Sequence, residues 1–559
     1  MLRELFCNTN ITKKLFKMRK FYSTLIVLLI CATTFSQVKF FEKVSYRGAF
    51  APGKAMWTEG WCNWDPQNTV YGATNKTVNA DITTNTTWST GDIILLQNKV
   101  YVTSGATLTI QPGVIIRGEK ATEATLIVCR GSKINAKGTA TNPIIFTSNF
   151  AAGARGLGDW GGVVLCGAGL INAAGGTSII EGGLDAVKAN YGGNNNNDSS
   201  GVLSYVRIEF AGFPFQPDKE LNGLTFGGVG SLTQIDHIQC SFTNDDSFEW
   251  FGGAVNCKYL VAYRGLDDDF DTDFGYGGMN QFLLGVRDPS IADQSASSTS
   301  EGFESDNDAA GSEAQPYTSA KFSNVTLIGP YRGSTTNTID PKFRRAIRIR
   351  RNSYISIYNS LLMDWTSGYH IDGTACELNA STDSLRFKNN IIAGMPTGKN
   401  LQVNAGTFNI YNWFAGKRND TLASTAGLLI TPYNFLTPDY RPATTSAAAT
   451  GADFTDGLIA ANSYTPASIG INNTINTIKA LVYPNPSNGS FAVSVNLNQP
   501  SDVMVTVYDL SGKMVASQVA SFKNGINTIN FNETTLTTGL YLVKILTNDG
   551  IATQKIEIE

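Results

Sequence analysis

The chain has 559 residues, 16% of them charged, and a formal net charge of -3. This length exceeds what one compact core usually holds, so we expect two or three units or one elongated unit. The balanced charge gives no reason to expect nucleic acid as a partner, and the 55 glycines favour short strands joined by turns over long helices.

The first 36 residues have the pattern of a signal peptide. Basic residues are concentrated in 13–20 and precede the apolar run 25–32, which is too short to span a bilayer and fits the core of an export signal. We predict cleavage after Ser36, with Met18 as an alternative start, whereas a lipoprotein site at Cys31 is disfavoured because Ile30 is too large. No later segment is long and apolar enough to cross a membrane, so we expect the mature protein to be soluble or surface-attached.

Aromatic residues gather near the start of the mature chain, where Trp57, Trp61 and Trp64 lie close together. Such a cluster can bind sugars by stacking. The open first turn of a coil of strands also needs a cover, because it exposes apolar columns and free strand edges. We therefore predict that 37–80 forms an N-terminal cap.

Internal repeats with similar short periods run through the central region. The run 107–110 recurs in type at 125–128, a spacing of 18, and 114–118 recurs at 134–138, a spacing of 20. The acidic segment 245–249 recurs at 267–271, a spacing of 22. A third, similar segment, 302–304, follows 269–271 after a longer interval, which indicates that one turn carries a long loop. Short strands with such periods are typical of a parallel β-helix, in which each turn stacks on the turn before.

The segments 104–113, 142–148, 159–165 and 205–212 resemble a family of exported bacterial right-handed β-helix proteins, a resemblance that covers about 45–455. It implies an all-β chain with a right-handed parallel β-helix over 81–455. Most members of that family are surface proteins of unknown activity, so the resemblance implies architecture and location but no reaction.

A ladder of acidic residues follows the period of 22. In a stacked coil, Asp245 lies beside Asp267 and Asp246 beside Asp268, and such like charges raise one another's pKa unless a cation intervenes. Calcium prefers six to eight oxygen ligands, so a calcium site is one hypothesis and a solvated acidic face is the other. The candidate ligands are Asp245, Asp246, Glu249, Asp267, Asp268, Asp269, Asp271, Asp273 and Glu304.

Paired carboxylates also serve glycoside hydrolysis. The segments 244–246, 267–268, 348–350 and 368–370 resemble polygalacturonase motifs, but here the Arg element precedes the His element, and Ile371 replaces the glycine after the histidine. The basic residues of 344–351 could supply a lyase base, although an alternating basic strand is more often an outer face that pairs with acidic loops. His237 alternates outward in its strand, so we expect it at the surface.

Six cysteines remain in the mature chain: Cys62, Cys129, Cys166, Cys240, Cys257 and Cys376. An exported protein can form disulfides, but Cys129, Cys166 and Cys240 lie in apolar runs, so buried thiols are favoured. With no CxxC pair and only two histidines, the chain is not expected to hold a structural zinc site.

The C-terminal sequence predicts a linker over 456–478 and a small antiparallel sandwich over 479–559. The predicted strands of the sandwich alternate apolar and polar residues. Its diagnostic residues are Pro484, Asn485, Pro486, Gly512, Lys513, Gly539 and Tyr541. They resemble the C-terminal sorting domain of type IX secretion cargo in Bacteroidetes. The resemblance implies docking on the secretion machinery at the outer membrane, removal of the domain, and anchoring to surface lipopolysaccharide or release.

We therefore predict a secreted or cell-surface β-helix protein that serves adhesion or binds an extracellular glycan. The alternative is a calcium-dependent polysaccharide lyase or glycoside hydrolase.

Overall fold

The computed structural model describes residues 39–559, except 216–219, 296–297, 405–407, 467–479, 498, 510–513, 534–535 and 548–549. The chain divides into two compact units, with the boundary after Tyr464. The predicted signal peptide and most of the predicted linker lie outside the described residues. Among the helices that the structure describes, none has the length and apolar content needed to cross a membrane.

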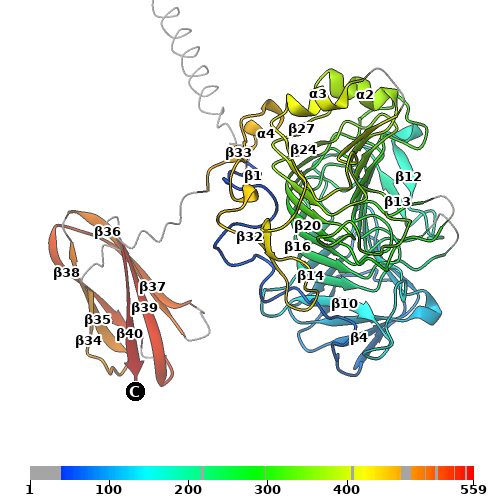
Figure 1. The fold of residues 1–559 in the computed structure, drawn as a ribbon. Coiled ribbons are helices and arrows are strands. Elements are labelled where there is room, and N and C mark those ends of the chain that lie inside the picture. Colours follow the sequence, from blue (N-terminus) through cyan, green and yellow to red (C-terminus); the bar gives the residue numbers. More distant parts are fainter. Residues whose placement is uncertain are drawn as a thin grey trace, which may run out of the picture. The chain divides into compact units, whose positions relative to one another are not determined.

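The larger unit, here called the body, is a parallel β-helix with three faces (Figure 1). Each complete turn of the coil contributes a strand segment to face 1, then to face 2, then to face 3. Face 1 consists of β3 (Thr86–Trp88), β6 (Thr107–Ile110), β9 (Lys133–Lys137), the first halves of β14 (Gly201–Glu209), β16 (Gln234–Ser241), β18 (Asn256–Tyr263), β20 (Met279–Val286) and β22 (Lys321–Ile328), then β24 (Ser356–Tyr358) and β27 (Phe387–Lys388).

Face 2 continues from the long strands, and face 3 carries the features described below. Face 2 consists of β2 (Lys76–Val78), β4 (Ile93–Leu96), β7 (Ile115–Gly118), β10 (Ile144–Ser148), the second halves of the five long strands, β25 (Leu361–Met363), β28 (Ile391–Ala393) and β30 (Asp420–Leu422). Face 3 consists of β5 (Lys99–Val102), β8 (Thr125–Val128), β11 (Gly162–Cys166), β15 (Leu224–Gly227), β17 (Phe248–Phe251), β19 (Phe270–Asp273), β21 (Phe303–Ser305), β23 (Arg345–Ile349), β26 (Ser367–Ile371) and β29 (Leu401–Val403).

In-register stacking fills the interior with columns of like residues. Phe248 pairs with Phe270, and Phe270 pairs with Phe303. Their ring centroids lie 5.6 and 5.0 Å apart, and all three side chains are buried. These pairs confirm the predicted spacing of 22 and the longer interval that follows it.

The two shorter predicted spacings, which come from 107–128 and 114–138, are wrong. Thr107 pairs with Lys133 on face 1, whereas Thr125 pairs with Lys99 on face 3, so one turn in this region is longer than either spacing. The two similar runs occupy different faces of the coil, because the alternation of apolar and polar residues is the same on every face.

The bend between faces 1 and 2 is made by residues with positive φ in the middle of the long strands. Tyr205, His237, Tyr259 and Phe282 adopt this conformation and stack outside the coil, with successive ring centroids 4.2, 4.5 and 5.2 Å apart. His237 projects outward as predicted. It does not lie at the open surface, because Trp61 packs against it and its side chain is 16% exposed.

The tryptophan-rich segment covers this aromatic column, so the prediction of a cap over the first turn is wrong. Trp57 contacts Tyr259, Trp61 contacts Tyr205, and Trp64 contacts Tyr263, with ring centroids 5.3, 5.9 and 5.2 Å apart. The segment thus lies along the flank of the body, where the outward-facing rings need burial.

Helices cover the last turn of the coil instead. α2 (Thr374–Ser381) and α3 (Ile410–Ala415) lie at that end (Figure 1). Phe414 of α3 stacks on Phe387, and Trp413 stacks on Tyr369. The inner column therefore ends under aromatic rings rather than in water.

Short elements complete the body. β1 (Phe41–Glu42) pairs with β33 (Ser463–Tyr464), so the body takes in the first part of the predicted linker, including α4 (Gly457–Ala460). Five of the six cysteines are buried free thiols, in agreement with the prediction of buried thiols for most of them, and Cys62 is a partly exposed free thiol. The remaining elements are β12 (Thr177–Ile179), β13 (Asn190–Gly192), β31 (Leu429–Thr431), β32 (Asp439–Pro442) and the 3-10 helices Lys120–Thr122, Ala174–Gly176 and Ala447–Ala449.

The smaller unit is an antiparallel sandwich, as predicted, with one sheet of β34-β35-β38 and one of β37-β36-β39-β40 around a shared apolar core. Asn485 ties its start to the last strand, because its side chain donates to Lys555 O at 2.8 Å and accepts from Glu557 N at 2.9 Å. Tyr541 is buried and donates to Thr537 O at 2.8 Å, whereas Gly512 and Lys513 lie outside the described residues. The strands are β34 (Ala480–Tyr483), β35 (Ser490–Leu497), β36 (Ser501–Tyr508), β37 (Met514–Phe522), β38 (Gly525–Asn532), β39 (Gly539–Thr547) and β40 (Gly550–Ile558).

A substitution in the inner column tests this packing. Phe270→Ala should destabilise the body by about 3–5 kcal/mol, because it removes a fully buried ring and leaves a cavity between two stacked neighbours. Val187→Ala, at a side chain that is 87% exposed, should change stability by less than about 0.5 kcal/mol. Denaturant unfolding of both variants measures the difference, and equal effects would contradict the registered core.

Candidate functional site

The outer surface of face 3 is a set of columns, because the strands are in register. Adjacent strands lie about 4.8 Å apart, so residues at the same position of successive turns are direct neighbours. The central column consists of Thr225, Glu249, Asp271, Glu304, Arg348, His370 and Gln402.

A second acidic column borders the amino ends of these strands. Asp246 accepts from the backbone N–H of Asp268 at 2.8 Å, and Asp268 accepts from the N–H of Glu301 at 2.6 Å. Asp245, Asp246 and Asp267 form a group of carboxylates that each offer one oxygen atom, and these oxygens lie within 4.8 Å of one another. The predicted neighbour relations of Asp245 with Asp267 and of Asp246 with Asp268 are therefore confirmed.

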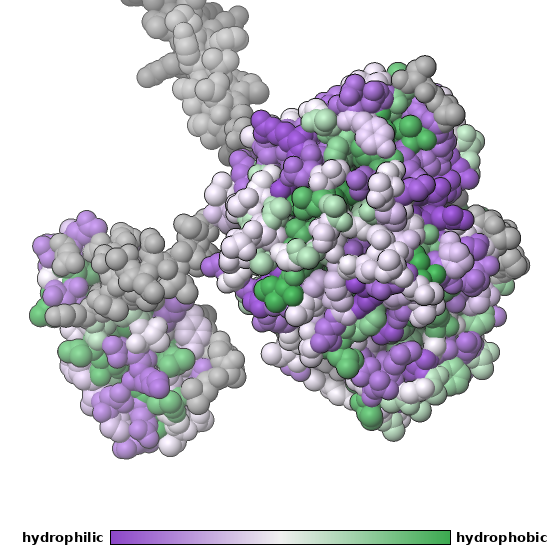
Figure 2. Space-filling model, viewed as in Figure 1, coloured by the Kyte–Doolittle hydropathy of each residue, from purple (hydrophilic) through white to green (hydrophobic). Residues whose placement is uncertain are grey.

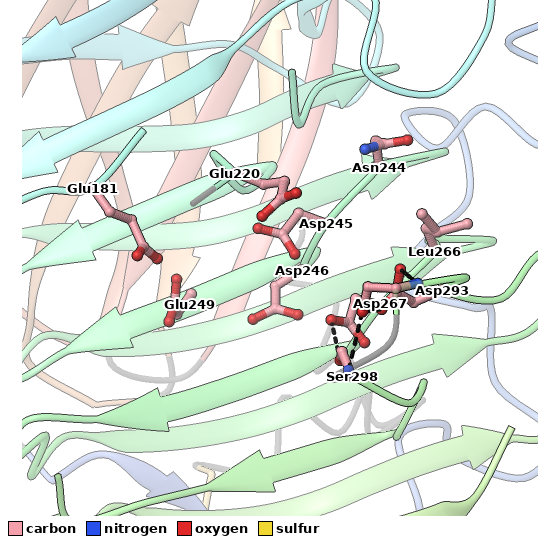
Figure 3. A pocket seen from close by; sticks show the side chains of 11 residues that line it. Glu181, Glu220, Asn244, Asp245, Asp246, Glu249, Leu266, Asp267, Asp293 and Ser298 are labelled. Carbon is pink, nitrogen blue, oxygen red and sulfur yellow. Dashed lines mark hydrogen bonds between the residues drawn. The ribbon is translucent and has the colours of Figure 1, made fainter. Parts of the chain in front are cut away.

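Asp245, Asp246, Glu249 and Asp267 line a cavity of about 220 Å³, here called the acidic pocket (Figure 3). Loops complete it, with Glu181 following β12, Glu220 preceding β15, and Asp293 lying between β20 and β21. These three loop residues were not predicted, because nothing in the local sequence shows that their loops fold over face 3. The carboxylates of the pocket are those of Glu181, Glu220, Asp245, Asp246, Glu249, Asp267 and Asp293.

Two carboxylate groups in and beside the pocket have the spacing of cation ligands. Asp246 belongs to both, with Asp245 and Asp267 on one side and with Glu249 and Asp271 on the other. Among the described residues, Oδ1 of Asp267 and Oδ1 of Asp271 are buried without a hydrogen-bond partner. Buried carboxylate oxygens that lack donors are the ligands that hard divalent cations prefer.

Burial and mutual repulsion disfavour the charged form of these groups. Burial, followed by the charge of Asp245, raises the pKa of Asp246 well above its usual range. Burial, followed by the charge of Asp271, does the same to the pKa of Glu249. Burial and Glu301 raise the pKa of Asp268 to about 8. Without a cation, the pocket therefore favours bound protons near neutral pH.

Five of the nine predicted ligands do not line the pocket. Asp268 and Asp271 lie beside it, and the other three lie farther away. Asp269 points into the body and forms an ion pair with Arg287 at 3.3 Å, and both side chains are fully buried. Its inclusion among the calcium ligands is wrong, because the chain turns just before β19 and directs this side chain inward. Asp273 lies at the far end of β19 and accepts from Phe274 N at 2.6 Å. Glu304 is held by arginines.

Ion pairs join acidic residues in and beside β21 to arginines in and beside β23, one in each column. Glu301 pairs with Arg345 at 2.8 Å, Glu304 with Arg348 at 3.2 Å, and Asp306 with Arg350 at 2.7 Å. The interpretation of the basic strand as an outer face that pairs with acidic residues is thus confirmed.

Arg348 and Arg350 are poor candidates for a catalytic base. Burial alone would lower the pKa of Arg348, but Glu304 and Asp372 outweigh it and raise the pKa. The pKa of Arg350 is raised in the same way by Glu304 and Asp306. A base must give up its proton near the working pH, and these guanidinium groups hold theirs more tightly.

His370 lies on the central column, three strands beyond Asp271, which is about 14 Å at the usual strand spacing. Burial, followed by the charge of Arg345, lowers its pKa. Because general acid–base catalysis needs hydrogen-bond reach, the acidic pocket and His370 do not form one catalytic centre.

The raised pKa values predict how stability depends on pH in the presence of a chelator. The pKa of Asp268 is about 8 and those of Glu301 and Glu304 are about 7, above the roughly 4 of an unfolded carboxyl. The folded state therefore binds more protons between these limits, so stability falls as pH rises through the folded values.

In EDTA, the unfolding midpoint of the body should rise as pH falls from 8 to 6. Asp268→Asn should flatten this dependence, whereas Glu123→Gln, at a side chain that is 43% exposed, serves as the control. A midpoint that rises with pH over this range would contradict the charge arrangement.

Comparisons with known proteins agree with this architecture. A family model described as a pectate-lyase-like β-helix domain matches residues 80–427. A second, described as a secretion system C-terminal sorting domain, matches 481–559. No protein among those with curated descriptions matches.

Among solved structures, full-length tailspike protein 2 of an Escherichia coli O157:H7 bacteriophage is similar at 10% identity with a TM-score of 0.22. The match covers 84% of this chain and 64% of that one. The sorting domain indicates handling by the type IX secretion machinery and secretion to the cell surface or extracellular space. With most of its length matched, the chain belongs to the pectate-lyase-like β-helix family.

Proposed function

We propose that this secreted protein binds an extracellular glycan on face 3, holds calcium in the acidic pocket, and does not cleave its ligand. After sorting, the body is carried on surface lipopolysaccharide or released. The observation that carries the proposal is the pair of carboxylate groups that share Asp246. On the same face, Arg348 and Arg350 in and beside β23 are held in ion pairs.

Calcium fits the acidic pocket because it accepts many oxygen ligands in irregular geometry. The two groups offer carboxylates from successive turns, and the loop residues Glu181 and Glu220 add further oxygens. A divalent cation would offset both the mutual repulsion of these carboxylates and the cost of burying their charges.

A glycan ligand is supported by the family and by the surface. The family description refers to pectate lyases, enzymes that act on a polysaccharide. In the view of Figure 2, apolar side chains on the body form small patches among polar ones, a mixed surface without one large apolar area. Binding is favoured over cleavage because Arg348 and Arg350, two of the candidate bases, hold their protons more tightly than a free guanidinium.

The raised carboxyl pKa values favour a second candidate, a glycoside hydrolase or lyase. A general acid must remain protonated near neutral pH, and Asp268 with a pKa of about 8 meets that condition. The two candidate functions differ in whether the protein cleaves the polysaccharide, and an assay for cleavage products distinguishes them.

Calcium should stabilise the body. A ligand at a hundred times its dissociation constant adds about 2.7 kcal/mol, so millimolar calcium should raise the unfolding midpoint of the wild type. Asp246→Asn should abolish most of this rise because Asp246 belongs to both carboxylate groups, and Glu123→Gln should keep it. An unchanged wild-type midpoint would eliminate the calcium site.

Incubation with pectin, alginate and other polysaccharides, with and without EDTA, tests the rest of the proposal. We expect calorimetric binding in calcium and no new reducing ends or unsaturated products. Turnover that EDTA abolishes would replace the binding function by a calcium-dependent lyase or hydrolase.

A further inference from the structure

We infer that face 3 carries a second, cationic subsite that binds a carboxylate or sulfate group of an anionic oligosaccharide without a metal. Together with the acidic pocket, it holds one saccharide chain that crosses several strands. This inference rests on the proposed glycan binding and deepens it by naming the ligand class.

The subsite is a cavity of about 320 Å³, here called the basic pocket, at the amino ends of β23, β26 and β29. Arg344, Arg345 and Lys399 contribute cations to its lining, and Asp340 contributes a carboxylate. Arg345 is held by Glu301 at 2.8 Å. In the described part of the chain, no ion pair includes Arg344 or Lys399. The pocket therefore keeps an excess of positive charge for an anionic ligand.

The neutral groups of the basic pocket suit the hydroxyls of a sugar. Thr366 Oγ1 donates to Phe343 O, and Ser367 Oγ donates to Lys399 O, both at 3.1 Å. Since these hydroxyl protons are already used, the oxygens are left as acceptors for sugar hydroxyls. The cations supply charge-assisted donors for a carboxylate or sulfate, so the pocket offers complementary partners to both parts of an acidic sugar.

Register places the two pockets on one line along face 3. Asp246, Asp268 and Glu301 form a chain of hydrogen bonds, because the backbone N–H of Asp268 donates to the carboxylate of Asp246 and the N–H of Glu301 donates to that of Asp268. Gly302 N then donates to Arg345 O, and Arg345 pairs with Ser367. Asp246 and Arg345 are three strands apart, about 14 Å at the usual spacing. A ligand that occupies both pockets must therefore be an oligomer.

The two pockets require different chemistry from the same ligand. The acidic pocket repels an anionic sugar unless a cation stands between them, whereas the basic pocket attracts it directly. Chelation should therefore remove one contact and leave the other, which separates the basic pocket from the calcium site in an experiment.

Calorimetry with galacturonate oligomers of increasing length tests the inference, with fully methyl-esterified oligomers as the neutral match and sulfated galactan oligomers as the second anionic class. In calcium, the long acidic oligomers should bind on the order of a hundredfold more tightly than the monomer, because two linked contacts act together. Arg344→Gln combined with Lys399→Gln should cancel that gain. In EDTA, the residual binding of the wild type should vanish in this double variant.

Lys133→Gln combined with Lys137→Gln is the matched control, since it removes two exposed lysines from β9 on face 1. It should leave affinity unchanged. Equal binding of esterified and acidic oligomers, or an unaltered Arg344/Lys399 double variant, would overturn the basic pocket while glycan binding stands. If no oligomer of either charge binds, both the function and the basic pocket are refuted. Preference between galacturonate and sulfated galactan identifies the anionic group.

Discussion

In-register stacking of strands at about 4.8 Å is the constraint on which both the stability and the chemistry of the body depend. Inside the coil it places the rings of Phe248, Phe270 and Phe303 in contact along one column, where proximity of like residues is favourable. Outside the coil the same proximity brings Glu249, Asp271 and Glu304 together, where it is costly. The acidic surface of face 3 follows from the geometry that builds the core.

The chain offsets this repulsion differently along the axis. At the step from β21 to β23, arginines meet carboxylates in every column. Toward β17, the central column carries Glu249 and Asp271, and among the described residues neither forms an ion pair, so protons or a bound cation would balance this charge. The outer face is therefore polarised, with crowded carboxylates toward β17 and ion-paired arginines toward β23. Asp269 and Arg287 inside the coil form a separate buried ion pair, as expected for charges that cannot reach solvent.

The sequence predicted the coil, the sandwich and the acidic ladder, because these depend on alternation and on a period that repeats charged residues. The predicted spacing of 18 residues in 107–128 was wrong, because the two similar runs belong to different faces of the coil. Asp269 was misassigned because its inward direction depends on the turn before β19, and its partner Arg287 comes from another strand. The flank position of Trp61 depends on positive-φ residues such as Tyr205, whose conformation no local pattern indicates. Glu181, Glu220 and Asp293 reach the pocket by loop folding, which has no periodic signal.

The most direct measurement is a crystal structure of the mature protein with calcium, located by its anomalous scattering. Register predicts an ion about 2.3–2.6 Å from carboxylate oxygens of two successive turns, with Asp246 and either Asp267 or Asp271 among its ligands. An acidic pocket that stays empty at saturating calcium, or an ion bound only by residues of one turn, would contradict the view that stacking creates the site.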